Sequence, residues 1–312
     1  MRTIFFRMLL VKYLYLGVAV LFLSGYNLAA GSDSFASTQK NTVMSAINIG
    51  SNNGNSNSSN NDEFKLINTV PLKANFITTD FLKNAYFITS KNQVMRYDST
   101  GNVTGVYSET QYGPAAFVDA KTPFNILVFY KEFATVVMLD MRMNNKRIFK
   151  LPNIGISSVS AACLSDDNYF WVFDQNEQRL KKINNNYEVI HKSMDLRQLL
   201  GVTLNPNFLT ESNGLIYLNV PELGILMFDI FGTFYSSISN TDIDVYDLKG
   251  FQVINDKLVF YNNGELTIIS PASLQKEIVP IPRSNNVIDV RLEAGNLYQL
   301  ENNEAKFYMI SK

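Results

Sequence analysis

The stretch VMRYDSTGNVTGVY, residues 94–107, has the layout of two β-strands joined by a tight turn. A run of mostly apolar residues leads to Asp98, Gly101 follows three positions later, and a Val-, Thr- and Tyr-rich run comes next. Asp suits such a turn because its side-chain oxygen can accept a backbone N–H two residues on, and Gly accepts a positive φ. Taken alone, the stretch predicts one β-hairpin.

The same layout recurs in ILMFDIFGTFYSSI, residues 225–238, where Asp229 stands in the place of Asp98. Further copies appear wherever two or three apolar residues end at a small polar turn residue. The full series is Tyr97-Asp98, Leu139-Asp140, Ile183-Asn184, Phe228-Asp229, Ile269-Ser270 and Ile310-Ser311. Successive turns are 42, 44, 45, 41 and 41 residues apart. The even spacing indicates an internal repeat.

Each interval holds about four strand-like runs rich in Val, Ile, Leu, Phe and Tyr. In the second unit the runs are AAFVDA (115–120), NILVFYKE (125–132), TVVMLD (135–140) and RIFKLP (147–152). Helical periodicity is nearly absent, and the one short helical stretch is 194–200. Four strands per 40–45 residues are typical of the blade of a β-propeller. The sequence therefore predicts an all-β fold, a six-bladed β-propeller over residues 64–312.

The sixth unit has only three runs, VIDVRLE (287–293), NLYQLEN (296–302) and KFYMIS (306–311). Another strand-like run, FKLINTVP (64–71), precedes the first unit and belongs to no blade. We expect this N-terminal strand to pair with the last blade and close the ring, because closure leaves no open sheet edge.

The N-terminal 62 residues differ from the repeats. Residues 1–30 read as a signal peptide, with basic residues, an apolar core and small residues before the end. The apolar core is short for a membrane span, although an uncleaved anchor is the alternative. Residues 31–62 are rich in Ser, Asn and Gly, which predicts a flexible tether, with a recognition tail as the alternative. We expect an exported protein of the periplasm or cell envelope, without a transmembrane span in the mature chain.

Composition excludes several functional classes. The chain has 312 residues and a formal net charge of −1, so nothing in it suggests binding to nucleic acid. Cys163 is the one cysteine and cannot form an internal disulfide, and we expect it to be buried. His191 is the one histidine and falls in an outer strand. No nucleophile elbow, phosphate loop, CxxC or HExxH motif is present.

The repeated apolar-Asp-x-x-Gly turn resembles that of six-bladed propellers of the NHL and TolB-like type, over residues 64–312. The segment GPAAFVDAKTPFNILVFYKEFATVVMLD, residues 113–140, also resembles uncharacterised exported propellers of Bacteroidota. These resemblances imply a location in the envelope and no assigned activity.

Propellers bind ligands in the central channel or on the loops of one face. We call top face the side formed by the connections between blades and by the turns between second and third strands. The Asp98-type turns fall on the opposite face. The candidate binding residues of the top-face loops are Tyr112, Lys131, Glu132, Asn176, Glu177, Glu222, Asn263, Arg283 and Asn285. Most of these residue types also suit plain hairpin turns.

Oxygen ligands on this face could hold calcium, as in calcium-dependent lactonase propellers, so calcium is the one cofactor left open. Asp242, Asp244 and Asp247 lie close in sequence but lack the Gly and the distal Glu of a calcium loop. A lyase or glycosidase is disfavoured because no paired aromatic and basic residues are evident. The run 98–100 (Asp-Ser-Thr) also resembles a Bacteroidota O-glycosylation site.

We therefore expect a non-catalytic binding or scaffold protein of the cell envelope. One face would engage a protein or glycan partner, with the chain a monomer or part of an envelope complex. The alternative is a calcium-dependent lactonase or hydrolase. Three or more Glu, Asp or Asn side chains converging within a few ångström at the channel mouth would favour the enzyme, and apolar or mismatched lining would favour the binding protein.

Overall fold

The computed structural model describes residues 63–284 and 286–311. The predicted signal peptide (1–30), the predicted tether (31–62) and the candidate residue Asn285 lie outside the described residues.

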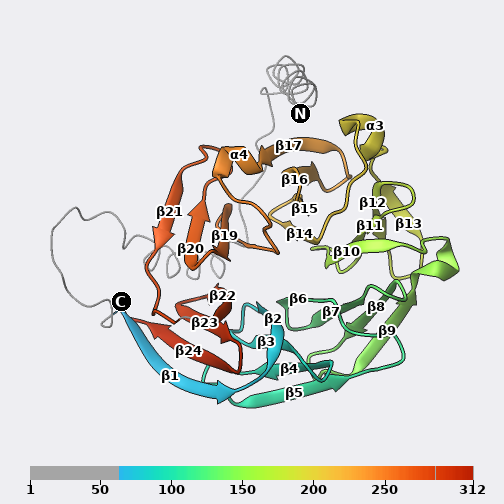
Figure 1. Ribbon diagram of the computed structural model, residues 1–312. Coiled ribbons are helices and arrows are strands. Elements are labelled where there is room, and N and C mark those ends of the chain that lie inside the picture. The colour runs from blue at the N-terminus through green and yellow to red at the C-terminus, as the bar shows by residue number, and fades with distance from the viewer. Residues whose placement is uncertain (1–62, 285, 312) are drawn as a thin grey trace, which may run out of the picture.

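Six four-stranded antiparallel sheets surround a common axis, which confirms the predicted six-bladed β-propeller (Figure 1). The strands of the first blade are β2 (Ala74–Thr79), β3 (Ala85–Thr89), β4 (Gln93–Tyr97) and β5 (Val103–Ser108). Those of the second are β6 (Phe117–Thr122), β7 (Asn125–Tyr130), β8 (Thr135–Leu139) and β9 (Asn145–Lys150). Those of the third are β10 (Val159–Leu164), β11 (Phe170–Asp174), β12 (Arg179–Ile183) and β13 (Val189–Lys192).

The remaining blades follow the same order from the axis outward (Figure 1). The fourth blade has β14 (Phe208–Ser212), β15 (Leu215–Val220), β16 (Gly224–Asp229) and β17 (Phe234–Ser239). The fifth has β18 (Gln252–Ile254), β19 (Lys257–Asn262), β20 (Glu265–Ile269) and β21 (Lys276–Val279). The sixth has β22 (Val287–Glu293), β23 (Asn296–Glu301), β24 (Glu304–Ile310) and, outermost, β1 (Phe64–Pro71).

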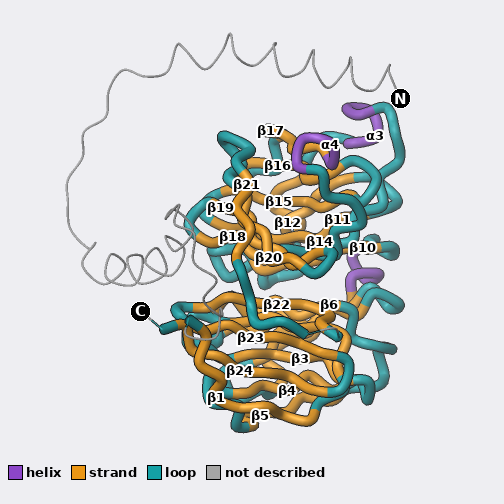
Figure 2. The backbone as a smooth tube through the Cα atoms, turned by 60° about the vertical axis from the view of Figure 1, so that its left-hand side comes forward, coloured by secondary structure: helices purple, strands orange, loops and turns teal. Residues whose placement is uncertain are grey.

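The outer strand of the sixth blade comes from the start of the described chain. β1 pairs antiparallel with β24, from Phe64 opposite Ile310 to Pro71 opposite Glu304. Figures 1 and 2 both show the two strands side by side. The last sheet thus has four strands only because residues 64–71 join it. That this strand holds the ring together remains a prediction.

The turn at residues 98–102 is held by the carboxylate of Asp98. Asp98 Oδ1 accepts the backbone N–H of Thr100 and of Asn102, both at 2.9 Å. Gly101 has a φ of 83°, in the left-handed region that favours glycine. Partial burial acts to raise the pKa of Asp98, but its hydrogen bonds with Asn102 and Thr100 outweigh this, so the pKa is lowered. The same two backbone bonds recur at Asp140, Asn184 and Asp229.

The core lies between neighbouring sheets, as one apolar cluster for each pair of blades. Trp171 is fully buried between the third and fourth blades, and its Nε1 donates to Glu211 Oε2 at 2.7 Å. Cys163 is buried in the same cluster, and this burial raises the pKa of its thiol. Each blade is therefore stabilised by contacts with both neighbours.

In residues 63–284 and 286–311, the helical turns lie in connections between sheets (Figure 2). The expected short helix is α3 (Leu196–Leu200), which Asp195 caps by accepting two backbone N–H groups. A second helix, α4 (Asn240–Ile243), begins at a capping box formed by Ser239. A 3₁₀ turn, η3, spans Leu151–Ile154. Within residues 63–284 and 286–311, no helix has the length and apolar character needed to cross a bilayer.

Candidate functional site

On the top face the channel widens into a hollow of about 760 Å³, here called the top hollow. This volume falls within the range of about 300–1,000 Å³ usual for small-molecule sites. All six blades contribute to its lining. Its polar walls include Asn75, Lys131, Ser160, Asn207, Tyr246, Asp247, Lys249, Tyr261, Asn262, Asn263, Asp289 and Arg291.

The floor of the top hollow is a row of aromatic rings. Phe76 meets Phe117 at 5.3 Å between ring centroids, Phe117 meets Phe208 at 5.5 Å, and Phe208 meets Phe251 at 4.9 Å. The third blade contributes only small residues here, such as Ala161. The Phe117 ring of the second blade can therefore contact the Phe208 ring of the fourth. Phe76, Phe117 and Phe208 also border a smaller hollow of about 180 Å³ beneath, the lower hollow. The rings thus divide the channel.

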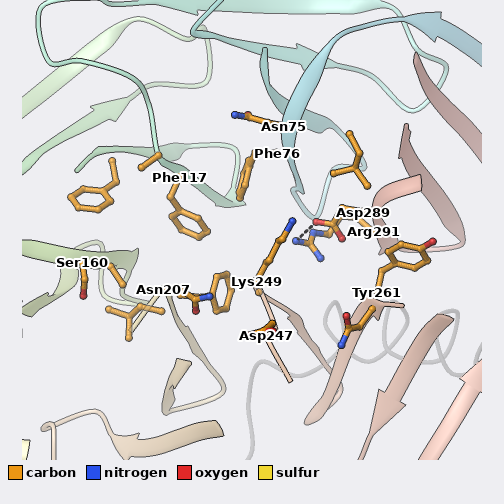
Figure 3. A pocket seen from close by; sticks show the side chains of 18 of the residues that line it. Asn75, Phe76, Phe117, Ser160, Asn207, Asp247, Lys249, Tyr261, Asp289 and Arg291 are labelled. Atoms are coloured by element: carbon orange, nitrogen blue, oxygen red, sulfur yellow. Dashed lines mark ion pairs between the residues drawn. The ribbon is translucent and has the colours of Figure 1, made fainter. Parts of the chain in front are cut away.

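The wall opposite the rings is charged. Arg291, buried on β22, forms an ion pair with Asp289 at 2.7 Å, and its Nε donates to the Ile77 carbonyl at 3.1 Å. Burial raises the pKa of Asp289, although the charges of Arg291 and Lys249 act to lower it. Lys249 extends into the hollow between Phe76 and the ion pair (Figure 3). Its ammonium makes no ion pair or hydrogen bond with any described residue.

Ser160 is a buried polar residue beside the top hollow. Its Oγ is buried and has no hydrogen-bond partner among the described residues, and the residue lines the top hollow. An unsatisfied buried hydroxyl costs about 1–3 kcal/mol. The Ser160 hydroxyl is therefore an unused donor and acceptor beside the hollow.

Two predicted binding residues, Lys131 and Asn263, line the top hollow. Lys131 also borders a hollow of about 500 Å³ between the second and third blades, together with Glu132 and Gln175. The structure thus brings three of the predicted residues to the two hollows of the top face.

Tyr112 is placed differently from the exposed position expected for a binding loop. It is only 5% exposed and stacks edge-on against Tyr130 at 5.6 Å. The Lys150 ammonium lies 5.9 Å from its ring centroid. Tyr112 therefore belongs to the core between the first and second blades.

The other predicted residues do not converge. Asn176 donates to Ser157 Oγ at 3.0 Å, and Glu177 forms an ion pair with Lys181 at 2.8 Å. Glu222 and Arg283 are exposed and line neither hollow.

Sequence reasoning missed the aromatic floor. Its signal was present as a repeated Phe at the start of the inner strand, in NF, AF, NF and GF at 75–76, 116–117, 207–208 and 250–251. The expectation that aromatic and basic residues are not paired is wrong for the top hollow, where Lys249 and Arg291 lie opposite the rings. These residues are far apart in sequence, so inspection of local motifs does not pair them.

Within the described part of the chain, no group of three or more His, Cys, Asp and Glu residues could hold a metal ion. Asp242 belongs to the capping box of α4, Asp244 ends that helix, and Asp247 lines the top hollow. The three carboxylates thus have separate places. Calcium binding remains a prediction, and no assembled cluster of carboxylates among the described residues supports it.

The lower hollow, on the opposite face, contains Glu293. Its Oε2 accepts the Thr79 hydroxyl at 3.3 Å, and burial raises the pKa of Glu293 to about 7. Glu211 borders the same hollow, but it accepts three hydrogen bonds, from Trp171, Ser165 and the Asp166 backbone. Glu293 is the less well satisfied of the two carboxyls.

No protein-family model matches the chain, and no curated protein does. Virginiamycin B lyase from Staphylococcus aureus, in a catalytically inactive form with quinupristin, is similar with a TM-score of 0.55 and 11% identity, over 80% of this chain and 100% of the lyase. The WD40 domain of Pan2 from Neurospora crassa gives a TM-score of 0.56 and 10% identity, over 80% and 96%. The Swd1 β-propeller domain from Myceliophteria thermophila gives 0.53 and 11%, over 80% and 100%. At such identities the similarity shows the propeller fold alone.

Proposed function

We propose that this chain is a non-catalytic binding protein that engages a protein or glycan partner over the top hollow. The observation that carries the proposal is the make-up of that hollow. Side chains from all six blades supply ammonium, amide, hydroxyl and aromatic groups around this one hollow. Such a mixture suits recognition, because a few polar groups in a partly apolar cavity fix the orientation of what binds.

The charges of the hollow disfavour the calcium-dependent enzyme. Calcium takes six to eight oxygen ligands, usually with carboxylates among them. Here Asp289 is already paired with Arg291, and the ammonium of Lys249 points at the same space. Positive side chains repel a cation, so the hollow suits an uncharged or negative partner better than a metal ion.

The N-terminal sequence supports the cellular part of the proposal. Its signal-peptide pattern supports a location in the periplasm or cell envelope, and the predicted tether would let the propeller reach a partner there. The repeated turns support a propeller of the NHL and TolB-like type, similar to exported propellers of Bacteroidota.

Affinity purification of the tagged protein from envelope extracts, with metal analysis of the same sample, tests this function. We compare the wild type with Lys249→Glu, which reverses one charge in the hollow. Lys276→Glu on the outer strand β21 is the matched control, because Lys276 is exposed and lines no described hollow. We expect one recurrent partner with the wild type and the control, and its loss with Lys249→Glu. Stoichiometric calcium without a partner would establish the enzyme alternative instead.

A further inference from the structure

We infer that the top hollow binds a carboxylate-bearing sugar unit of the uronic acid type. The inference deepens the proposed function and rests on it, because it assigns a ligand chemistry to the same hollow.

The first argument is charge. Lys131 and Lys249 come from different blades, both are exposed, and neither forms an ion pair with a described residue. Arg291 is neutralised by Asp289, and the Lys249 ammonium points away from Asp247 (Figure 3). The lining of the hollow therefore carries one positive charge in excess. The cations are Lys131, Lys249 and Arg291, and the carboxylates are Asp247 and Asp289. A single carboxylate matches this excess better than a doubly charged phosphate, and the one guanidinium that could bind a phosphate through two bonds is already occupied.

The second argument is the neutral polar lining. Asn75, Ser160, Tyr261 and Asn262 carry amides and hydroxyls that both donate and accept hydrogen bonds. Sugar hydroxyls have the same dual capacity. The Ser160 Oγ is buried and has no hydrogen-bond partner among residues 63–284 and 286–311, so it offers one such bond without losing an internal one. An acidic peptide side chain would use the ammonium groups but leave most of these neutral groups unpaired, which weakens binding.

The third argument is the floor. Phe76, Phe117 and Phe208 give the hollow an apolar base opposite the charged wall. A pyranose ring carries C–H groups on its faces and polar groups around its edge. Such a ring can lie on the aromatic floor with its hydroxyls toward the amides and its carboxylate toward Lys249. The three kinds of lining group are therefore placed for the three parts of one ligand.

Calorimetric titration of the purified protein tests the inference, with trigalacturonic acid as probe, neutral galactotriose as its uncharged counterpart, and a Glu-rich peptide as the competing chemistry. We expect the triacid to bind at least about tenfold more tightly than the neutral trisaccharide, as suits one charge-assisted bond. Its affinity should fall as salt is raised, because both ammonium groups are exposed. Equal binding of the two sugars, or binding of the peptide alone, would overturn the inference.

Substitutions place the binding in the hollow. Lys249→Met and Lys131→Met should each weaken triacid binding about five- to tenfold, and Ser160→Ala by a smaller factor. Lys276→Met should leave the affinity unchanged. The three lysines are exposed, so we expect their variants to keep the parent melting temperature. Ser160→Ala removes a buried hydroxyl that has no partner among the described residues, so it should not lower the melting temperature. Triacid binding that survives Lys249→Met and Lys131→Met would contradict the assignment.

The proposed binding function and the assignment of a sugar ligand can be contradicted separately. If envelope partners depend on Lys249 but no saccharide binds, the binding function stands and the sugar assignment falls. If neither the partner nor any saccharide depends on Lys249, both fall.

Discussion

At the residue scale, Asp98 shows how one carboxylate fixes a turn. Besides its two backbone bonds, it accepts the Thr100 hydroxyl at 2.7 Å and the Asn102 side-chain amide at 3.2 Å. Asp98→Ala removes all of these acceptors, and we expect a loss of about 1–2 kcal/mol in the free energy of unfolding. Ser99→Ala in the same turn, which removes no hydrogen bond seen in the described residues, should change it by less than about 0.5 kcal/mol. Urea unfolding measures both, and equal losses would contradict the role of Asp98.

Glu293 makes the stability of the protein depend on pH. Its pKa is about 7 in the folded protein, because of burial, against an ordinary value of 4.5. Between pH 4.5 and about 7, the folded state therefore keeps a proton on Glu293 that the unfolded state has released. The stabilisation is fully present below pH 4.5 and is lost as pH rises to about 7.

Glu293→Gln keeps the size of the side chain but cannot ionise. We expect the variant to unfold with a free energy about 1–3 kcal/mol higher than the parent at pH 8, and to match it more closely near pH 4.5. Urea unfolding at a series of pH values measures the difference. Glu265→Gln, at an exposed position of β20, is the control and should follow the parent. A Glu293→Gln curve parallel to the parent throughout would show that Glu293 ionises normally.

At the element scale, most strands could be predicted from the sequence, because each is a run of apolar residues bounded by turn residues. The runs at 64–71 and 287–293 coincide with β1 and β22. Where a predicted boundary is wrong, a local cause can be named. The run 147–152 predicts one strand, but β9 ends at Lys150, because Pro152 has no N–H for the sheet ladder and instead lies in the first turn of η3, which begins at Leu151.

The top hollow was much less predictable than the strands. Lys131 and Asn263 were predicted as binding residues from their positions in top-face loops, but Lys249, Ser160 and Arg291 were not. The prediction considered residues in loops, whereas Ser160 and Arg291 lie on the inner strands β10 and β22. Lys249 does lie in a connection between blades, before β18, but no local pattern distinguishes it from its neighbours there. Which of them meet depends on how six blades close on one another, and no local pattern contains that information.

The aromatic floor joins inner strands that share no backbone hydrogen bonds. Phe208 is 7% exposed and contacts both Phe117 and Phe251. Phe208→Ala leaves a cavity at the axis, and we expect a loss of about 3–5 kcal/mol in the free energy of unfolding. Phe208→Leu keeps most of the apolar volume and should cost less than about 2 kcal/mol. Denaturant unfolding compares the two, and equal costs would show that the ring contacts add little to stability.

At the scale of the whole molecule, we expect stability to depend on closure, because every apolar cluster of the described residues lies between two blades. Phe64 of β1 packs in the cluster between the fifth and sixth blades, and Val70 packs against the cluster between the sixth and first. β1 therefore touches two of the six blade interfaces in addition to its ladder with β24. Loss of this one strand would loosen three neighbouring blades and not merely the edge of one.

A chain of residues 72–312, compared with one of residues 63–312, tests this argument. We expect the shorter chain to melt at least about 5 °C lower, since about 1 kcal/mol corresponds to about 2–4 °C in a domain of this size. Cys163, buried in the third blade far along the ring from β1, gives a second readout. If the ring unfolds as one unit, its thiol should also react faster with iodoacetamide in the shorter chain, whereas fraying of the sixth blade alone would leave that rate unchanged. Leu66→Ala, at a position 50% exposed on the same strand, should alter neither quantity. Equal melting temperatures for the two chains would mean that β1 pairs with the last blade without holding the ring together.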